Sequence, residues 1–322
     1  MSLLDQLVET PVLRISRFSD IDQFRSIETV VDARSIPLDP KTFKSGFAKL
    51  TLNSGAIHLQ QTFPRILQVR YLSAGASIVF GMDDAVSAVM NGMEGSGSTM
   101  MIAKGGADCE FVEPRSNLVA LISFDSVEDR GWPGDDGRAQ LVAVRPEALQ
   151  ALRATIRDIL MLASTWPETL LLPDMPQHLE ESILNAIDHA VIPAVPLFET
   201  KRANLTHYLD LVRKLDELLH HNSGRTVYSA DMAAQLKVSV RTLHTAAVAI
   251  RGMSLHRYMR LRRLWSVRQQ LMTGSALDTV KTIALANGFW HLGEFSSLYR
   301  NLFGETPQQT LLAARRLKSG LQ

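Results

Sequence analysis

The spacing of apolar residues changes character partway along this 322-residue chain. Between residues 46 and 144, short apolar runs with alternating polar residues are separated by turns rich in Gly, Pro, Ser and Asn. Such runs predict β-strands, and turns roughly every ten residues are typical of an antiparallel sandwich or small barrel. The runs are KLTL, AIHLQQTF, ILQVRYL, ASIVFGM, STMMIA, CEFVE, LVALISF and QLVAV.

Two stretches that follow the strand region have helical spacing instead. Residues 146–164 begin with a proline, which suits the first turn of a helix, and residues 176–192 show a similar apolar stripe. These helices would pack either on the sheet of their own domain or on a partner chain. Residues 192–204 contain two prolines and predict a linker.

One helical pattern occurs twice in the last hundred residues. It reads DMAAQLKVSVRTLHTAAVAIRG over 231–252 and TIALANGFWHLGEFSSLYRNLFG over 282–304. The glycines that end the copies, Gly252 and Gly304, are 52 residues apart. Each copy has the length of a helix, a tight turn and a second helix, and Ser239 is placed to cap the second helix of the first copy. Two such units suit a surface that contacts duplex DNA twice.

A helix over residues 255–272 is expected to connect the copies. One of its sides would carry an apolar stripe and the other a row of arginines. The stripe is Tyr258, Leu261, Leu264 and Leu271, and the row is Arg257, Arg260, Arg262, Arg263 and Arg268.

Charge divides the chain in the same way as the apolar pattern. Residues 1–200 hold 16 Lys+Arg and 26 Asp+Glu, a net charge of −10, whereas residues 201–322 hold 18 Lys+Arg and 7 Asp+Glu, a net charge of +11. A basic helical segment is expected to bind a polyanion, because neutralised phosphates release condensed counterions. The acidic part could also dock on the basic part and mask it.

The segment from about Asn204 to Leu317 resembles the AraC-type DNA-binding domain. The resemblance rests on the sequences LKVSVRTL, RYMRLRRLWSVRQQLM and IALANGFWHLGEFSSLYRNLFGETP. The motif GFWHLGEF is similar to that of a branch of ethanolamine-utilisation regulators. It implies seven helices and two recognition helices that enter successive major grooves. The chain departs from the family at Ala247, where Phe is usual, and at Leu255, where Pro is common.

The fold class expected is therefore α+β. A β-rich effector-binding or dimerisation domain, a sandwich or barrel with flanking helices, would occupy residues 1–200. An all-α DNA-binding domain would occupy residues 201–322. Its two helix-turn-helix subdomains would lie at 229–252 and 279–304 and be joined by the helix 255–272.

The resemblance also indicates which side chains would read DNA. Ser239 would bind phosphate at a helix N-terminus, which positions the protein without reading sequence. Arg241 could contact guanine and Glu294 could accept from cytosine. Trp290 would lie on DNA or pack in the corner beside Phe289, and His291 would contact DNA or be a solvated surface residue. The full set is Ser239, Val240, Arg241, His244, Thr245, Trp290, His291, Glu294 and Ser297.

The effector and its contact residues cannot be read from the sequence. Inward-facing strand residues are the candidates for a pocket wall, although most would be core. Three arginines would matter only for an anionic ligand and are otherwise expected to be ordinary surface residues. The first group is Phe63, Tyr71, Phe80, Met82, Met101 and Phe111, and the second is Arg65, Arg70 and Arg115. A lone strand histidine such as His58 is expected to be a hydrogen-bonded wall residue rather than a metal ligand.

The remaining features narrow the class of protein. The single cysteine, Cys109, excludes an internal disulfide framework and suits a cytoplasmic protein, and we expect that thiol to be buried. No secretory signal or long uncharged apolar run is evident, so no membrane association is expected. No nucleophile–base pair or metal set supports an enzyme, and neither a cofactor nor a metal is expected.

These observations predict a transcription regulator that binds promoter DNA under the control of a small-molecule effector of unknown identity. A homodimer is expected, and RNA polymerase could be a further partner. The alternative is a non-specific, ligand-independent or architectural DNA-binding protein. Competition between specific and random duplexes separates the two.

Overall fold

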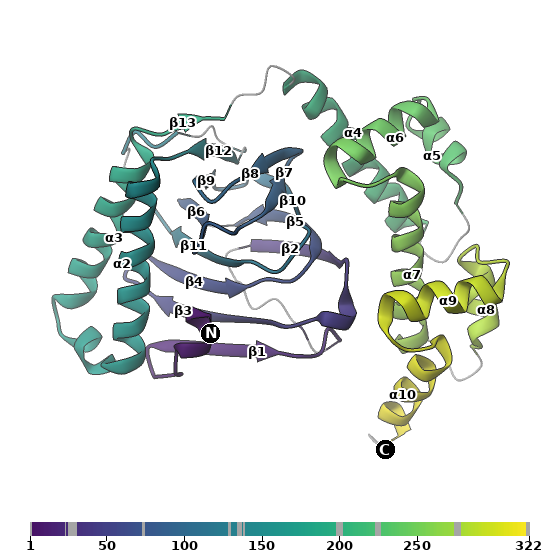
Figure 1. Ribbon diagram of the computed structural model, residues 1–322, viewed down its shortest axis with the longest axis horizontal. Helices are drawn as coiled ribbons and strands as arrows, with labels where there is room; N and C mark the ends of the chain where they lie inside the picture. The colour runs from purple at the N-terminus through teal and green to yellow at the C-terminus, as the bar shows by residue number, and fades with distance from the viewer. Residues whose placement is uncertain are drawn as a thin grey trace. The chain divides into compact units, whose positions relative to one another are not determined.

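The computed structural model describes residues 2–22, 24, 31–72, 75–127, 130–133, 137, 139–197, 202–222, 227–273 and 278–319. Its contacts divide the chain into two units (Figure 1). The β unit comprises Met1–Pro37 and Phe43–Glu199, and the helical unit comprises Leu38–Thr42 and Thr200–Gln322. No helix in the described ranges has the length and apolar character needed to span a bilayer.

The β unit contains two antiparallel sheets packed face to face, so the chain has the expected α+β class with a sandwich at its front. In order across the larger sheet, the strands are β1 (Leu13–Phe18), β3 (Ser45–Thr51), β4 (Gly55–Gln61), β11 (Leu118–Phe124), β6 (Ala76–Gly81), β9 (Thr99–Lys104), β12 (Gln140–Ala143) and β13 (Val195–Pro196). In the smaller sheet they are β2 (Val31–Pro37), β5 (Arg65–Tyr71), β10 (Asp108–Glu113), β7 (Ala88–Met90) and β8 (Met93–Gly95).

The alternation along each strand decides what each face of the larger sheet contacts. On β4, Ile57 and Leu59 belong to the core shared with the helices, whereas His58 and Gln60 face the space between the sheets. His58 is paired with Leu121 of β11 and with Lys49 of β3 in the strand register. Side chains two residues apart share a face, so the inner wall is built from alternate residues of each strand.

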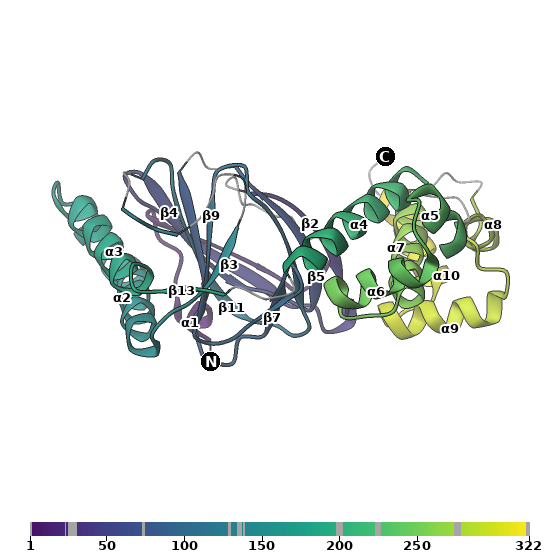
Figure 2. The same cartoon turned by 90° about the horizontal axis from the view of Figure 1, so that it is seen from above.

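Helices α2 (Pro146–Thr165) and α3 (Met175–Val191) cover the outer face of the larger sheet (Figure 2). The apolar stripes expected from the sequence are buried there or packed against that core, so these faces are used within the unit rather than for a partner chain. The short helix α1 (Leu3–Gln6) joins the same core. Part of the predicted linker forms β13, which pairs with β12.

The helical unit has seven α-helices in its described residues. They are α4 (Arg202–His221), α5 (Ser229–Gln235), α6 (Val240–Arg251), α7 (Leu255–Thr273), α8 (Val280–Ala286), α9 (Leu292–Phe303) and α10 (Pro307–Ser319). A short apolar cluster joins α4 to α6, and a larger one that is rich in aromatic residues joins α7, α8, α9 and α10.

The row of arginines expected on the outside of α7 is only partly outside. Arg257 is exposed and Arg260 is half-buried, but Arg268 is 8% exposed and pairs with Glu305 at 2.7 Å. The prediction that Arg268 lies on the outside was wrong, because its position is on the buried side of α7. Its position falls in register with Leu264 and Leu271, which places it on the apolar stripe. Its guanidinium also lies 4.9 Å from the ring centre of Phe303.

Candidate nucleic-acid interface and internal cavity

The two helix-turn-helix copies have matching helices. Helices α5 and α8 each have seven residues and start 51 positions apart, and α6 and α9 each have twelve residues and start 52 positions apart. The second copy therefore has one additional residue in the turn that precedes its second helix. Val238 and Phe289 occupy equivalent corners 51 positions apart, so Trp290 is the additional residue. It is 61% exposed.

The turns and helix ends follow the same plan in both copies. Lys237 (φ 55°) and Gly288 (φ 79°) both have left-handed backbone, and Gly252 (φ 64°) and Gly304 (φ 79°) end α6 and α9 in that conformation. Glycine adopts this conformation at little cost, and it frequently ends helices. The N-caps of the second helices differ, because the side chain at the start of α6 makes a capping hydrogen bond and the one at the start of α9 does not.

Ser239 caps α6 as expected. Its Oγ accepts a hydrogen bond of 3.0 Å from the backbone N–H of Thr242. The equivalent residue in the second copy, His291, is the N-cap of α9 but makes no side-chain capping bond. The N–H groups at the start of α9 are therefore not capped by the His291 side chain, and such groups can bind an anion.

All nine side chains predicted to contact DNA are exposed. Five lie at the start of α6 or in its first two turns, and four lie in the turn before α9 or along its first half. Helices α6 and α9 lie at different heights along α7 in Figure 1 and along the same edge of the helical unit in Figure 2. The structure thus places the two helices that carry the predicted residues along one edge of that unit. For Trp290, exposure favours the alternative in which it faces outward.

The opposite faces of α6 and α9 are buried, but with different kinds of side chain. Leu243, Ala246, Ala247 and Ile250 of α6 are at most 1% exposed. In α9, Phe295 and Tyr299 have ring centres 5.8 Å apart, and Tyr299 lies 4.4 Å from Phe303. Ala247 and Tyr299 are equivalent positions, 52 residues apart. The first copy compensates for its smaller side chains by packing α6 on α4.

A buried ion pair also fixes α6. Arg251, 1% exposed, donates to Asp216 of α4 at 2.6 Å, and the Tyr258 hydroxyl of α7 donates to the other oxygen of the same carboxylate. Burial, followed by the Asp216 charge, raises the pKa of the Tyr258 phenol well above its usual value. The three residues connect the candidate recognition helix α6 to α4 and to α7.

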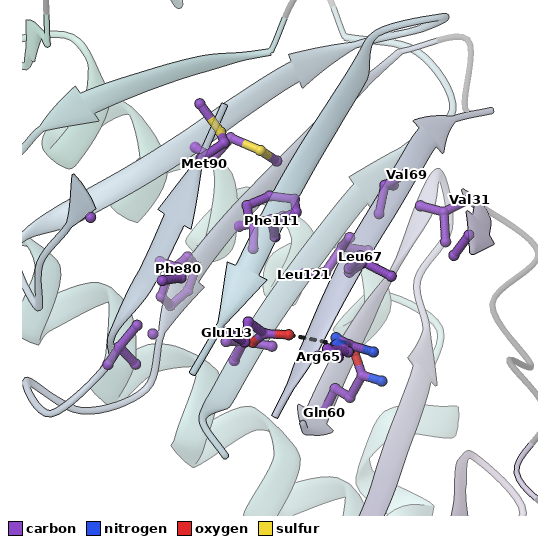
Figure 3. A pocket seen from close by; sticks show the side chains of 18 of the residues that line it. Val31, Gln60, Arg65, Leu67, Val69, Phe80, Met90, Phe111, Glu113 and Leu121 are labelled. Atoms are coloured by element: carbon purple, nitrogen blue, oxygen red, sulfur yellow. Dashed lines mark hydrogen bonds and ion pairs between the residues drawn. The ribbon is translucent and has the colours of Figure 1, made fainter. Parts of the chain in front are cut away.

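The β unit contains a cavity of about 320 Å³ between its sheets (Figure 3). Apolar side chains from both sheets line most of it, and several of them remain partly exposed although they lie in mid-strand. This size lies at the lower end of the range found for small-molecule sites. The apolar wall includes Val31, Leu67, Val69, Tyr71, Val79, Phe80, Met90, Met101, Phe111, Val119, Leu121 and Leu141.

Four of the six residues expected to line a pocket do so, namely Tyr71, Phe80, Met101 and Phe111. The ring centres of Phe63 and Phe43 lie 4.8 Å apart, and Met82 belongs to the core between the larger sheet and the helices. Neither Phe63 nor Met82 lines the cavity. Cys109 is buried beside this wall as expected. In the described part of the chain, no group of three or more His, Cys, Asp or Glu side chains could hold a metal ion.

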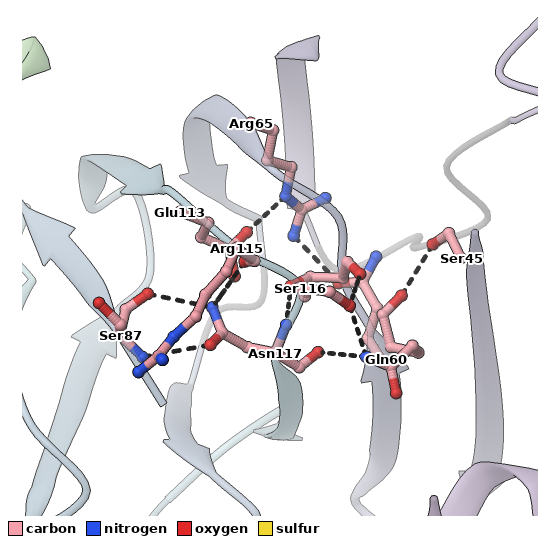
Figure 4. Close-up of polar contacts among 10 residues, drawn as sticks. Ser45, Gln60, Arg65, Ser87, Glu113, Arg115, Ser116 and Asn117 are labelled. Carbon is pink, nitrogen blue, oxygen red and sulfur yellow. Dashed lines mark hydrogen bonds and ion pairs between the residues drawn. The ribbon is translucent and has the colours of Figure 1, made fainter. Parts of the chain in front are cut away.

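A buried ion pair forms one polar part of the cavity wall. Arg65 is 5% exposed and its Nε donates to Glu113 Oε2 at 2.6 Å, so the expectation that Arg65 is a surface residue was wrong. The other oxygen of Glu113 accepts from Asn117 Nδ2 at 3.2 Å (Figure 4). Arg70 and Arg115 are surface residues, as expected. Glu113 was not among the predicted residues, because only the pairing of β5 with β10 places it opposite Arg65.

His58 forms a second polar part of the wall, and its environment differs from the one predicted. The side chain is 3% exposed, and among the described residues its Nε2 has no hydrogen-bond partner. The prediction of a hydrogen-bonded wall residue was therefore wrong about the bond, although His58 does line the cavity. Burial, followed by the charge of Lys49, lowers the pKa of His58 to about 4, which keeps the ring neutral near pH 7.

The cavity wall is connected to α2 through one buried arginine. Arg153 of α2 donates from Nε to the carbonyl of Gly81, which lines the cavity, at 2.7 Å. It also donates to the carbonyls of Asp83 and Gly97, at 2.9 Å and 2.5 Å. A shift of the Gly81 backbone would therefore be transmitted to α2.

Three comparisons with known proteins bear on the helical unit. Residues 232–313 match the family model of a helix-turn-helix domain. The XylDLEGF operon transcriptional activator of Pseudomonas putida is 33% identical over 101 residues, which are 31% of this chain and 32% of that protein. The HTH-type transcriptional activator RhaS of Pectobacterium atrosepticum is 32% identical over 90 residues, 28% of this chain and 32% of that protein. The matched stretches thus span about a third of the length of these relatives.

A solved structure of a probable AraC family transcriptional regulator from Rhodopseudomonas palustris is 33% identical, with 33% of this chain and 97% of that chain covered and a TM-score of 0.30. The likeness to the ethanolamine-utilisation branch stays a prediction. The match over residues 232–313 and the similarity to transcriptional activators confirm the family predicted from the sequence. The chain carries a helix-turn-helix DNA-binding domain of the AraC type in its helical unit.

Proposed function

We propose that this chain is a sequence-specific transcription regulator whose DNA binding responds to a small molecule held in the β unit. The observation that carries the proposal is the pair of twelve-residue helices, α6 and α9, with all nine predicted contact residues exposed. Each helix would lie in a major groove, and the two grooves would be successive turns of one duplex, about 34 Å apart.

The side chains suggest how each helix would contribute. Arg241 can donate two hydrogen bonds to a guanine, and His244 and Thr245 lie beyond it on the same exposed face of α6. Glu294 of α9 would accept from a cytosine amino group. Trp290 would lie against a thymine methyl group or the sugar-phosphate backbone. Ser239 and the start of each helix would contact phosphates.

The cavity between the sheets supports the effector part of the proposal. Most of its lining residues are apolar and a minority are polar, which is the usual composition of a small-molecule site. The bonds from Arg153 to Gly81, Asp83 and Gly97 give a bound molecule a route to α2. Dimerisation, contact with RNA polymerase and masking of the basic helical unit by the acidic β unit remain predictions from the sequence.

A competition experiment tests the DNA-binding part. A labelled duplex carrying the candidate promoter site is bound to the full chain and challenged with unlabelled specific or random duplex over a series of salt concentrations. We expect random duplex to compete at least about a thousandfold less well, as for other specific DNA-binding proteins. Equal competition by both duplexes would favour the architectural alternative and contradict the proposal.

A further inference from the structure

We propose that the cavity of the β unit binds an uncharged, mostly apolar small molecule that carries a hydroxyl or carbonyl group, and that this group hydrogen-bonds to His58. The inference rests on the proposed effector role of the cavity and gives the chemical class of its ligand. Three observations lead to it, namely the volume and lining of the cavity, the ion pair in its wall, and the unpaired buried nitrogen of His58.

The volume and the lining set the size and polarity of the ligand. A cavity of about 320 Å³ has room for roughly ten water molecules by their share of liquid volume, which corresponds to a molecule about the size of a substituted six-membered ring. Leu67, Phe111 and Leu121 lie in mid-strand and still keep accessible surface. An apolar ligand would cover that surface and gain hydrophobic free energy.

The ion pair argues against a charged ligand. Arg65 and Glu113 are both at most 5% exposed, and each neutralises the other at 2.6 Å. Both carboxylate oxygens of Glu113 already accept hydrogen bonds, one from Arg65 and one from Asn117. Lys49, the neighbour of His58 on β3, does not line the cavity. A ligand with a net charge would therefore lose its hydration without gaining an unpaired counter-ion from the described residues of this wall.

His58 supplies a buried polar group in the described wall that has a nitrogen without a hydrogen-bond partner. Its side chain is almost fully buried and lines the cavity, and its Nε2 has no partner among the described residues. A buried polar atom without a hydrogen bond is costly, so a ligand that provides one is favoured once a small shift of the ring opens that atom to the cavity. Neutral imidazole has one donor and one acceptor nitrogen, and a hydroxyl group can match either of them.

Four probes of nearly the same shape test the inference on the full chain. Benzyl alcohol carries the neutral polar group, ethylbenzene lacks it, benzoate is an anion and benzylammonium is a cation. Affinities are measured by ligand-observed NMR at pH 7. We expect benzyl alcohol to bind about threefold to tenfold more tightly than ethylbenzene, the gain typical of one hydrogen bond, and both ions to bind at least about tenfold more weakly than the alcohol.

Variants assign the polar contact to His58. In His58→Leu the preference for benzyl alcohol over ethylbenzene should disappear while ethylbenzene still binds, and the melting temperature should not fall, because an unpaired buried nitrogen is replaced by carbon. A purely structural role would instead lower the melting temperature. His58→Gln, which keeps a polar head, should retain part of the preference. It also covers the case in which the leucine variant fails to fold. His178→Leu, an exposed histidine on α3, is the control.

The outcomes separate this inference from the proposed function. The inference is wrong if either ion binds as tightly as benzyl alcohol, if neither neutral probe binds, or if both His58 variants bind the alcohol as the parent chain does. Gel shifts on the same preparations report DNA binding independently. Specific DNA binding without binding of any neutral probe would overturn only the ligand class, and probe binding without specific DNA binding would overturn only the proposed function.

Discussion

Arg251 donates a hydrogen bond of 2.6 Å to the carboxylate of Asp216 in the interior of the helical unit. The two residues are 1% and 6% exposed, and they join α6 to α4. Tyr258 of α7 donates to the same carboxylate. The first helix-turn-helix copy, whose apolar core is built from small and aliphatic side chains, thus depends on one buried charge pair to fix its recognition helix.

Replacement of Asp216 by Asn should strongly destabilise the helical unit. The buried Arg251 charge would lose its counter-ion, and breaking such pairs typically costs about 3–5 kcal/mol. Urea unfolding monitored by circular dichroism measures the change. The control is Asp210→Asn on the same helix, since Asp210 pairs with Lys214 at 2.7 Å and both side chains are more than half exposed. That variant should change stability by less than about 1 kcal/mol. Equal effects of the two substitutions would contradict the role given to Asp216.

Two glycines in the recognition helices should respond in opposite directions to alanine. Gly252 ends α6 at φ 64°, and although an added Cβ would contact nothing within 4 Å, this conformation costs an alanine about 1 kcal/mol. Gly293 lies inside α9 with equally open surroundings, so alanine there should stabilise by about 0.5–1 kcal/mol. Thermal melting shows whether the melting temperature of each variant rises or falls. A higher melting temperature for Gly252→Ala would contradict the left-handed conformation at the end of α6.

The N-caps of α6 and α9 make a second matched pair. Ser239→Ala removes the bond to the Thr242 N–H and should cost about 1 kcal/mol. His291→Ser places a capping side chain at the equivalent position of α9 and should stabilise by up to about 1 kcal/mol. Chemical denaturation of the two variants measures both changes in the free energy of unfolding. A stabilising Ser239→Ala would show that the cap of α6 contributes nothing.

The stability of the β unit should fall as the pH is lowered through the titration range of His58. Its pKa is lowered from 6.5 to about 4 in the folded chain, so the unfolded chain takes up the proton first. No penalty exists above pH 6.5. The loss accumulates between pH 6.5 and about 4 and reaches on the order of 3 kcal/mol. Unfolding free energies of the parent chain and of His58→Leu, measured over this range, should converge as the pH rises. Parallel curves would contradict the assignment.

The elements of the fold that sequence could predict are those with a strong period. All eight apolar runs between residues 46 and 144 coincide with strands, from β3 to β12, and α2 and α3 begin and end within one residue of their predicted bounds. Strands β1, β2, β7 and β8 were not among the predicted runs. Strands β7 and β8 have three residues each, too few to show alternation, and β2 has two buried residues of seven. Their pairing with neighbouring strands defines them.

The residues of the candidate sites likewise include some that the sequence could predict and some that it could not. The outward positions of α6 and α9 follow from helical spacing alone, because Leu243 and Phe295 fix the inward face in each copy. The wall of the cavity depends instead on which strands meet across the sandwich. From its sequence alone, Arg65 is expected to lie at the surface, and only the pairing of β5 with β10 shows that Glu113 lies opposite it. His58 becomes an unpaired buried base only once both sheets enclose it.

The central claim, that α6 and α9 read different parts of one site, can be tested by selecting binding sites from a pool of random duplexes. The parent chain, Arg241→Ala and Glu294→Ala are compared. We expect an enriched site for the parent chain. Each variant should lose preference at a different base pair, the two positions should lie about ten base pairs apart, and the affinity lost should be about 1–3 kcal/mol. No enriched sequence for the parent chain, or relaxation of the same base pair by both variants, would contradict the account.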